Sequence, residues 1–510
     1  MSAADFAGYE RASTGIEGLD SVLGGGLPRD RMYLIEGAPG AGKTTLALQF
    51  LLAGARYGEP GVYATMSESE LELNEVSRSH GWQLDGISFC ALQSAQESLR
   101  AESQYTLFHP SEIELSETTR AVLDTIERVH PARLVLDSLS EMRLLARDPL
   151  LYRRQILSFK RYCTGRRCTV LLLDDTAGTS DFHLQTLTHG IISLENLDQE
   201  EYGGQRRRLR IKKLRGVAFR DGYHDYSIRT GGLAVQPRLV AANHRRTQVL
   251  ELVGSGLPEL DALLGGGIER GTGTLLLGPS GVGKSTLAMQ YVFAAAARGE
   301  RSVVYLFDEL PAVWTARGAG LGMDFAPLLA CGDVELRYVD PAELSPGELS
   351  ERVRRAVESG TRLVVIDSLN GYQSSMPGER FLGMHLRELL SFLNEHGVLT
   401  LMVLTQHGLV GSVVEAPIEL SYLADNVILL RYFEAFGEIR QAISVIKRRA
   451  GSHGRSIREL RLDRGGVRVG RELRDFQGVL GGNLTYVGDR HPLLTERKSA
   501  GRKSRSHAAG

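Results

Sequence analysis

The chain has 510 residues, too many for a single hydrophobic core and enough for two to four domains. Apolar residues make up 42% and charged residues 24%, a composition typical of globular proteins that excludes an intrinsically disordered chain. The formal net charge of −1 argues against nucleic acid as the main partner, because no overall positive field would attract it. No apolar run reaches the roughly eighteen residues that cross a bilayer, and the start MSAADFAGYE lacks a signal-peptide pattern, so we expect a cytoplasmic protein with no membrane partner.

The first half of the chain alternates short apolar runs with longer segments of helical period. The runs typical of buried parallel strands are MYLIE, VYAT, LVLD, TVLLL and GIISL. This alternation predicts an α/β fold in which helices cover both faces of a mostly parallel sheet.

The stretch GAPGAGKTT follows the first of these runs and opens a predicted helix. It fits the phosphate-loop pattern G-x-x-x-x-G-K-[ST], and its position between a strand and a helix makes the match specific. The glycines let backbone N–H groups surround phosphate oxygens, while Lys43 reaches the β and γ phosphates and Thr44 offers a hydroxyl to Mg²⁺. The predicted nucleotide-binding residues are Gly37, Gly40, Gly42, Lys43, Thr44 and Thr45.

Two acidic positions follow later strands of the first half. The run VYAT continues as MSESE, which places Ser67 and Glu68 where enzymes of this architecture carry the base that orients water. Asp137 ends the run LVLD, where a carboxylate lies beside the phosphate loop and can hold Mg²⁺. The alternatives are a solvated helix start for Glu68 and a capped turn for Asp137.

The second half repeats this organisation. GPSGVGKST, from Gly278 to Thr286, is a near copy of the first phosphate loop, and SGLPELDALLGGGI ahead of it matches TGIEGLDSVLGGGL ahead of the first. The runs TLLL, VVYLF, LVVID and TLMVL predict the corresponding strands, so a whole domain is duplicated. The second set of predicted nucleotide-binding residues is Gly278, Gly281, Gly283, Lys284, Ser285 and Thr286.

The second copy carries one more carboxylate than the first. VVYLFDELP supplies Asp308 and Glu309 as candidate catalytic residues, where the first copy has Ser67 and Glu68. Asp367 ends the run LVVID and is the second predicted magnesium ligand, alongside Ser285. The sequence therefore predicts two nucleotide sites of unequal chemistry.

The repeat sets the predicted domain boundaries. We expect one domain over residues 1–246, a second over 247–490, and a disordered basic tail over 491–510. Each domain ends in two neighbouring strand-like runs, GIISL with LRIKKL and DNVILLRY with QAISVIK. We interpret both pairs as antiparallel additions at the edge of the sheet.

The combination resembles the KaiC family of tandem RecA-like P-loop ATPases. The features that carry the resemblance are the duplicated T/S-G-x-x-x-L-D-x-x-L-G-G-G motif, the phosphate loop, the acidic positions and the L/I-D-S-L motif, and they extend over roughly residues 13–487. The resemblance implies a hexamer of two stacked rings with ATP between neighbouring subunits. It also implies ATP hydrolysis, serine/threonine autokinase activity in the second ring and signalling or clock partner proteins.

The resemblance assigns further residues. KKLRG and KRRAG lie where the family directs cations to the neighbouring subunit's phosphates, which makes Lys213, Arg215, Lys447 and Arg449 candidate nucleotide ligands in trans. Charges that protect an exposed edge strand from pairing are the alternative. The family's phosphate acceptors lie ahead of DNVILL, where this chain has Ser421 as a candidate acceptor followed by Tyr422.

Three functions are compatible with the sequence. The first is a self-assembling ATPase and autokinase for signalling or timing, in which the first ring mainly binds ATP and the second carries more of the phosphoryl chemistry. The second is a nucleotide-sensing scaffold without kinase activity, which Ser67 favours for the first ring. The third is a RecA-like nucleic-acid motor using the basic stretch 153–167, but Ile156, Leu157 and Phe159 within it fit a helix packed on a core.

Overall fold

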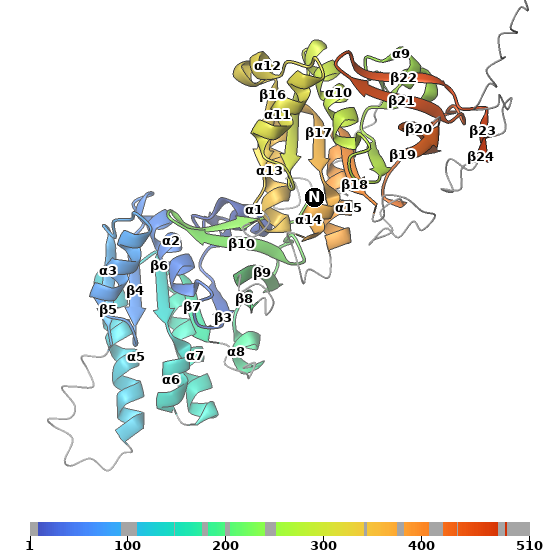
Figure 1. Cartoon of the computed structure of the whole chain (residues 1–510). Coiled ribbons are helices and arrows are strands. Elements are labelled where there is room, and N and C mark those ends of the chain that lie inside the picture. The colour runs from blue at the N-terminus through green and yellow to red at the C-terminus, as the bar shows by residue number, and fades with distance from the viewer. Residues whose placement is uncertain are drawn as a thin grey trace, which may run out of the picture.

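The computed structural model describes residues 9–92, 110–146, 148–175, 182–198, 205–239, 251–340, 344–374, 382–406, 422–435, 437–477 and 485–486. Within these ranges the chain forms two α/β units, each built on a nine-stranded, mainly parallel sheet (Figure 1). The predicted fold class, two tandem RecA-like P-loop domains, is confirmed. The predicted boundaries near residues 246 and 490 and the tail 491–510 fall outside the described residues and stay predictions.

The first sheet joins a parallel part to an antiparallel extension. The order is β11-β10-β9-β8-β3-β7-β6-β4-β5, in which the strands from β8 to β5 are parallel and those from β8 to β11 are antiparallel. Its strands are β3 (Met32–Gly37), β4 (Gly61–Thr65), β5 (Ile87–Ala91), β6 (Arg133–Asp137), β7 (Thr169–Asp175), β8 (Gly190–Asp198), β9 (Gln205–Leu214), β10 (His224–Arg229) and β11 (Gly232–Gln236).

The second sheet repeats this topology, in the order β16-β15-β17-β18-β14-β19-β20-β21-β22. The strands from β16 to β19 are parallel, and those from β19 to β22 are antiparallel. Its strands are β14 (Gly273–Gly278), β15 (Arg301–Leu306), β16 (Val334–Tyr338), β17 (Thr361–Asp367), β18 (Leu399–Thr405), β19 (Asn426–Ala435), β20 (Glu438–Arg448), β21 (Arg458–Asp463) and β22 (Gly466–Glu472).

Helices cover both faces of each sheet, as predicted. In the first unit, Leu34 and Leu172 belong to one apolar core, while their strand neighbours Ile35 and Leu171 belong to the core of the opposite face. The helices of this unit are α1 (Glu17–Leu23), α2 (Lys43–Ala55), α3 (Glu70–Ser79), α5 (Pro110–Val129), α6 (Leu139–Ala146), α7 (Pro149–Thr164) and α8 (Phe182–Leu187). A sheet buried on both faces explains the continuous apolar runs of its parallel strands.

The second unit has the corresponding helices around two further cores. They are α9 (Pro258–Leu263), α10 (Lys284–Ala297), α11 (Pro311–Gly320), α12 (Ala326–Cys331), α13 (Pro346–Glu358), α14 (Leu369–Ser374) and α15 (Leu382–Glu395). Three two-stranded pairs complete the described structure: β1 (Arg11–Ala12) with β2 (Leu27–Pro28), β12 (Leu252–Val253) with β13 (Ile268–Glu269), and β23 (Phe476–Gln477) with β24 (Thr485–Tyr486).

The motif ahead of each phosphate loop folds around its aspartate. The carboxylate of Asp20 accepts the backbone N–H of Thr14 at 2.8 Å and the hydroxyl of Thr14 at 2.7 Å. Asp261 accepts the same two groups of Ser255 at 2.7 Å each. In each unit, the Thr or Ser and the Asp of the motif therefore close a turn. This turn leads into the short helix α1 or α9.

The prediction for the sheet edges was right in part. The two runs of each pair are antiparallel to each other, as predicted, and GIISL in β8 is parallel to β3, as its place among the parallel runs predicts. The interpretation of both runs as antiparallel additions was wrong for β8 and β19, which are parallel to β3 and β14. Each extension also continues through a further hairpin, β10 with β11 or β21 with β22. Two parallel strands, β5 and β16, were missed because they lie at the opposite edge and are half-buried, which weakens the apolar run.

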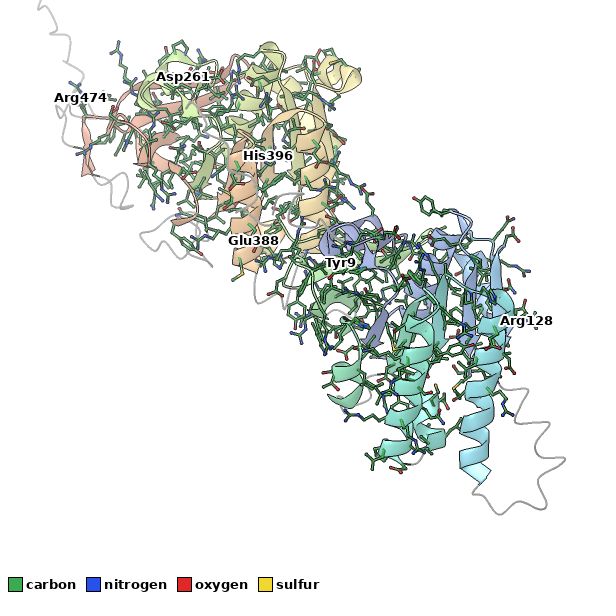
Figure 2. The ribbon with its side chains drawn as sticks, turned by 180° about the vertical axis from the view of Figure 1, so that it is seen from behind. Tyr9, Arg128, Asp261, Glu388, His396 and Arg474 are labelled. Atoms are coloured by element: carbon green, nitrogen blue, oxygen red, sulfur yellow. The ribbon has the colours of Figure 1, made fainter. Side chains whose placement is uncertain are left out.

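The two units contact each other through the end of the first extension. The backbone N–H of Gly347 in α13 donates to the Asp225 carboxylate in β10 at 2.8 Å, and Arg238 forms an ion pair with Glu388 of α15 at 2.9 Å. Figure 2 shows Glu388 at the junction between the units.

In the described part of the chain, no helix is long and apolar enough to cross a membrane.

Candidate active sites

Both phosphate loops have the backbone that the pattern predicts. Each links the end of a central strand to the start of a helix, and Gly42 and Gly283 occupy the position just before that helix with φ of 93° and 106°. A Cβ on Gly42 would lie 2.6 Å from Cδ1 of Ile228 in β10, and one on Gly283 would clash with Leu462 in β21. Glycine is required at both positions by conformation and by space.

The two phosphate-loop lysines have different partners. Lys43 Nζ donates to the carbonyls of Gly37 at 2.8 Å and Ala38 at 3.1 Å, and it forms an ion pair with Asp175 Oδ1 at 2.6 Å. Lys284 Nζ donates to the carbonyl of Pro279 at 2.7 Å, and burial lowers the pKa of Lys284 to about 8. Sequence reasoning missed Asp175, whose only signal was the DD pair at the end of TVLLLDD.

At the first site the carboxylates gather around the helix start. The hydroxyl of Tyr63 donates to Asp137 Oδ2 at 2.5 Å. Burial raises the pKa of Asp137 above its ordinary value, opposed by this hydrogen bond and by the charge of Lys43. Burial, with the charge of Asp137 second, also raises the pKa of Glu68 to about 7, although a hydrogen bond from the Thr44 hydroxyl opposes the shift. The structure thus brings together Thr44, Glu68 and Asp137, and their roles stay predictions.

At the second site each carboxylate has a different neighbour. Glu309 forms an ion pair with Arg317 of α11 at 2.7 Å, and Asp308 accepts a hydrogen bond from the hydroxyl of Ser368. Burial raises the pKa of Asp367 to about 6, opposed first by the Ser285 hydroxyl and then by the charge of Arg317. Arg317 was not predicted, because it lies eight residues beyond Glu309 on a surface helix and carries no motif.

The backbone confirms how the acidic positions of the two copies correspond. The N–H of Met66 donates to the carbonyl of Asp137 at 2.8 Å, and the N–H of Phe307 donates to the carbonyl of Asp367 at 2.8 Å. Ser67 therefore occupies the place of Asp308, and Glu68 that of Glu309. The second site has one carboxylate more than the first, as predicted, because Asp308 stands at the structural position that Ser67 occupies in the first site.

The residues present fit a magnesium ion. Asp367 Oδ2 is buried and has no hydrogen-bond partner among the described residues, which leaves a hard oxygen beside the hydroxyl of Ser285. Thr44 and Asp137 place the same two groups at the first site. The described residues contain no cluster of three His, Cys, Asp or Glu side chains, but Mg²⁺ takes most of its shell in such sites from a hydroxyl, phosphates and water.

The four basic candidates lie at equivalent places on β9 and β20 or just after them. Lys213 and Lys447 are half-buried and donate to carbonyls of their own chain, with distances of 2.7 Å to Thr188 and 2.8 Å to Ala424. Arg215 is exposed and donates to the carbonyl of Thr186 at 3.0 Å. Arg449 is exposed and forms an ion pair with Asp425 at 3.0 Å. Whether they reach a neighbouring subunit stays a prediction.

Two other predictions concern the acceptor and the basic helix. Ser421 lies outside the described residues, and the neighbouring Tyr422 is exposed, with its carbonyl accepting from Arg449 at 3.5 Å. In α7, Ile156 and Phe159 are buried and Leu157 packs beside them on the core, as predicted.

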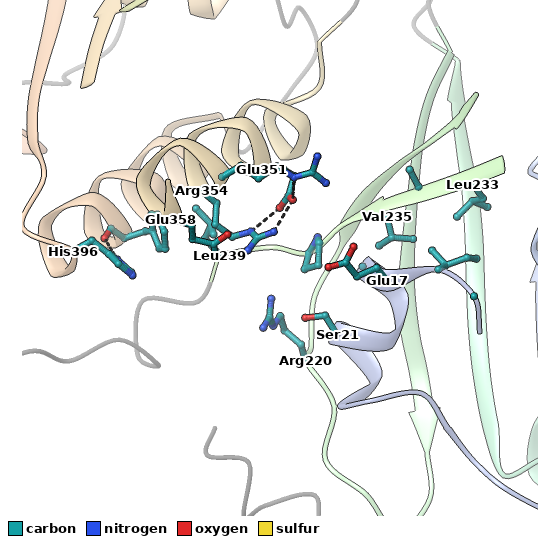
Figure 3. A pocket seen from close by; sticks show the side chains of 17 residues that line it. Glu17, Ser21, Arg220, Leu233, Val235, Leu239, Glu351, Arg354, Glu358 and His396 are labelled. Carbon is teal, nitrogen blue, oxygen red and sulfur yellow. Dashed lines mark hydrogen bonds and ion pairs between the residues drawn. The ribbon is translucent and has the colours of Figure 1, made fainter. Parts of the chain in front are cut away.

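A cavity of about 380 Å³ lies between the two units, and none of its lining residues belongs to a phosphate loop (Figure 3). Its lining includes Glu17 and Arg220 from the first unit and Glu351, Arg354 and His396 from the second. Arg354 is already paired with Glu351 at 2.7 Å. The cavity therefore belongs to the junction between the units and not to the nucleotide sites.

The fold and the two phosphate loops define a class of protein, the tandem RecA-like P-loop ATPases. A family model described as "ATPase: KaiC" matches this chain twice, over residues 12–240 and 253–474. The chain belongs to the KaiC family of ATPases, which implies ATP binding.

Curated proteins are similar along nearly the full length of the chain. "Circadian clock protein KaiC3" of Synechocystis sp. is 26% identical over 493 residues, which cover 94% of this chain and 95% of the relative. "Circadian clock oscillator protein KaiC" of Picosynechococcus sp. is 24% identical over 488 residues, covering 94% and 93%. The protein of the same name from Thermostichus vulcanus is 25% identical over 489 residues, also covering 94% and 93%.

Proposed function

We propose that this KaiC-family ATPase binds Mg²⁺ and ATP at both phosphate loops and hydrolyses ATP unequally. The first site mainly binds nucleotide and turns over slowly, while the second carries more of the phosphoryl chemistry. The observation that supports this division is the single structural position occupied by Ser67 in the first site and by Asp308 in the second. The ion pair between Glu309 and Arg317 adds to it, because it holds the carboxylate of Glu309 in place.

The residues of the second site have distinct roles in this proposal. Lys284 and the N–H groups of its loop bind the β and γ phosphates. Ser285 and Asp367 hold Mg²⁺, which neutralises the charge of the transferring phosphoryl group. Glu309 orients the attacking hydroxyl and accepts its proton, with Asp308 beside it.

We further propose a hexamer of two stacked rings with ATP between neighbouring subunits. Arg215 and Arg449 support this, because both are exposed and their contacts among the described residues, carbonyls and the Asp425 carboxylate, can be exchanged for a phosphate. Mass photometry with and without ATP tests the assembly. The proposal requires ATP to favour the hexamer, and it requires Arg215→Ala and Arg449→Ala to slow hydrolysis in the assembled protein.

The second ring is proposed to act as a serine/threonine autokinase. The hydroxyl oxygen of Ser421 would attack the γ phosphorus of ATP, its proton would pass to Glu309 and ADP would leave. Incubation with Mg²⁺ and γ-labelled ATP, following released phosphate and protein-bound label together, tests this. Label that is lost in Ser421→Ala supports the autokinase.

Released phosphate without protein label would instead favour an ATPase whose output is conformational. That outcome fits the scaffold, which Ser67 supports for the first ring, and it would direct the search to signalling or clock partner proteins. A motor would show hydrolysis stimulated by single-stranded DNA or RNA, which we do not expect because the apolar face of α7 serves the core.

A further inference from the structure

The two phosphate-loop lysines differ in one charged contact. Lys43 forms an ion pair with Asp175 at 2.6 Å, whereas among the described residues no carboxylate lies within ion-pair distance of Lys284. Lys284 donates to a backbone carbonyl and has the charge of Asp367 nearby. The side chain of Lys43 is 9% exposed and that of Asp175 is 35% exposed. A buried ammonium group thus meets a carboxylate that lies nearer to solvent.

The residue that corresponds to Asp175 in the second unit is Thr405. Asp175 pairs with Gly37 across β7 and β3, and Thr405 pairs with Gly278 across β18 and β14. The N–H of Asp175 donates to the hydroxyl of Ser140 at 3.1 Å, and the N–H of Thr405 donates to Oδ1 of Asn370 at 2.7 Å.

Ser140 and Asn370 are themselves corresponding residues, because each is the third residue after the aspartate of its D-S-L motif. The two backbones therefore match at this position, and a carboxylate in one site replaces a hydroxyl in the other.

The neighbouring Asp174 does not share this role. Its carboxylate accepts from the hydroxyl of Ser140 at 3.0 Å and forms an ion pair with Arg143 at 2.8 Å. These contacts tie Asp174 to α6, so Asp175 is the member of the DD pair that contacts the phosphate loop.

A carboxylate beside Lys43 repels the phosphate groups of a bound nucleotide. The phosphate-loop lysine contacts the β and γ phosphates of a bound nucleotide, so those oxygens come close to any group paired with Lys43. Binding must also separate Lys43 from Asp175, and the repulsion grows with the charge of the nucleotide. ATP carries one phosphate more than ADP on this side and is penalised more.

We propose that Asp175 is a specificity-determining residue of the first site, which lowers its affinity for ATP relative to ADP. The second site, with Thr405, lacks this discrimination. The inference rests on the proposed nucleotide binding at the first loop and adds how that loop discriminates between ATP and ADP.

Calorimetric titration of the full chain with ATP and with ADP, each in the presence of Mg²⁺, tests the inference. Every variant also carries Lys284→Ala, which abolishes binding at the second site so that the first is observed alone. Asp175→Asn and Asp175→Thr should each raise the affinity for ATP by about tenfold or more and the affinity for ADP by much less. Asp175→Glu should keep the ratio of the two affinities.

The duplicated site supplies the matched reverse experiment. In a Lys43→Ala background, Thr405→Asp should weaken ATP at the second site more than ADP. Equal changes for both nucleotides, or no change in Asp175→Asn and Asp175→Thr, would overturn the inference. If the phosphate loops did not bind nucleotide at all, the result would differ. The double variant Lys43→Ala with Lys284→Ala would then bind nucleotide as well as the unsubstituted chain does.

Discussion

The two nucleotide sites share a backbone but differ in the side chains that surround the lysine and the acidic residues. Strand register and helix position match the following first-site residues with second-site residues: Tyr63 with Val304, Ser67 with Asp308, Val76 with Arg317, and Asp175 with Thr405. Both sites keep a phosphate loop, a hydroxyl after its lysine and the aspartate of the D-S-L motif. The two units thus share the residues expected to bind a nucleotide and differ in the side chains around them.

Glu68 and Glu309 occupy the same structural position but have different surroundings. Glu68 lies in a buried, acidic environment that raises its pKa to about 7, so a large fraction of its carboxyl groups is protonated at neutral pH. Glu309 has Arg317 at 2.7 Å, and Asp308 lies beside it where the first site has Ser67. A base must be ionised to accept a proton, and the raised pKa of Glu68 is why we assign the slower chemistry to the first site.

The largest expected effect is the loss of one site at a time. Lys43→Ala and Lys284→Ala each remove a charged phosphate ligand, which should weaken nucleotide at that site by about 100-fold or more. Calorimetry should show the number of tightly bound nucleotides per chain fall from two to one in either variant, and each variant is the control for the other. Loss of both sites from one substitution would break the comparison.

A smaller effect concerns acid stability. His224 is buried in β10, where its Nδ1 accepts the N–H of Arg238 at 3.0 Å, and burial lowers its pKa to about 4. The corresponding residue of β21 is Arg458, so the second unit has no histidine at this place.

The direction of this pH effect on stability follows from proton uptake by His224 on unfolding. Unfolding restores the ordinary pKa near 6.5, so the unfolded chain binds a proton that the folded unit excludes, and stability falls as pH drops through the range between 6.5 and 4. The first unit should lose about 2 kcal/mol between pH 7 and pH 5 relative to His224→Gln. Hydrogen exchange resolved by unit measures this, and an equal loss in the variant would exclude His224 as the cause.

The ion pair of Glu309 provides the next test. Arg317→Met should lower phosphate release at the second site about tenfold in a Lys43→Ala background, because the carboxylate loses the charge that holds it. Arg317→Lys should recover part of the rate. A rate that rises in Arg317→Met would mean that the ion pair withholds Glu309 from the reaction.

The smallest effect is at Tyr63. Tyr63→Phe removes the hydroxyl that bonds to Asp137 and should raise the Mg²⁺ concentration that half-saturates the first site about threefold, because the ligand is less well fixed. Tyr33→Phe is the matched control, since Tyr33 is also fully buried and its hydroxyl donates to the carbonyl of Pro28 at 2.6 Å. An equal Mg²⁺ effect in both variants would indicate a general loss of stability.

The sequence predicted the parts of these sites that lie in local motifs. The phosphate loops, the difference between Ser67 and Asp308, and the strands that are apolar throughout could all be read from residue order. The contacts of Asp175 with Lys43 and of Arg317 with Glu309 could not, because each depends on how separate elements pack. The hairpins β10 with β11 and β21 with β22 were missed since their half-buried strands lack a continuous apolar run.

The most direct test of the division of labour is phosphate release by the full chain with Glu68→Gln and with Glu309→Gln, each a near-isosteric loss of one base. We predict that Glu309→Gln removes most of the turnover, by a factor on the order of 100, and that Glu68→Gln changes it little. Nucleotide binding measured in parallel should be retained in both. Unchanged turnover in Glu309→Gln together with abolished turnover in Glu68→Gln would show that the two sites have the opposite roles.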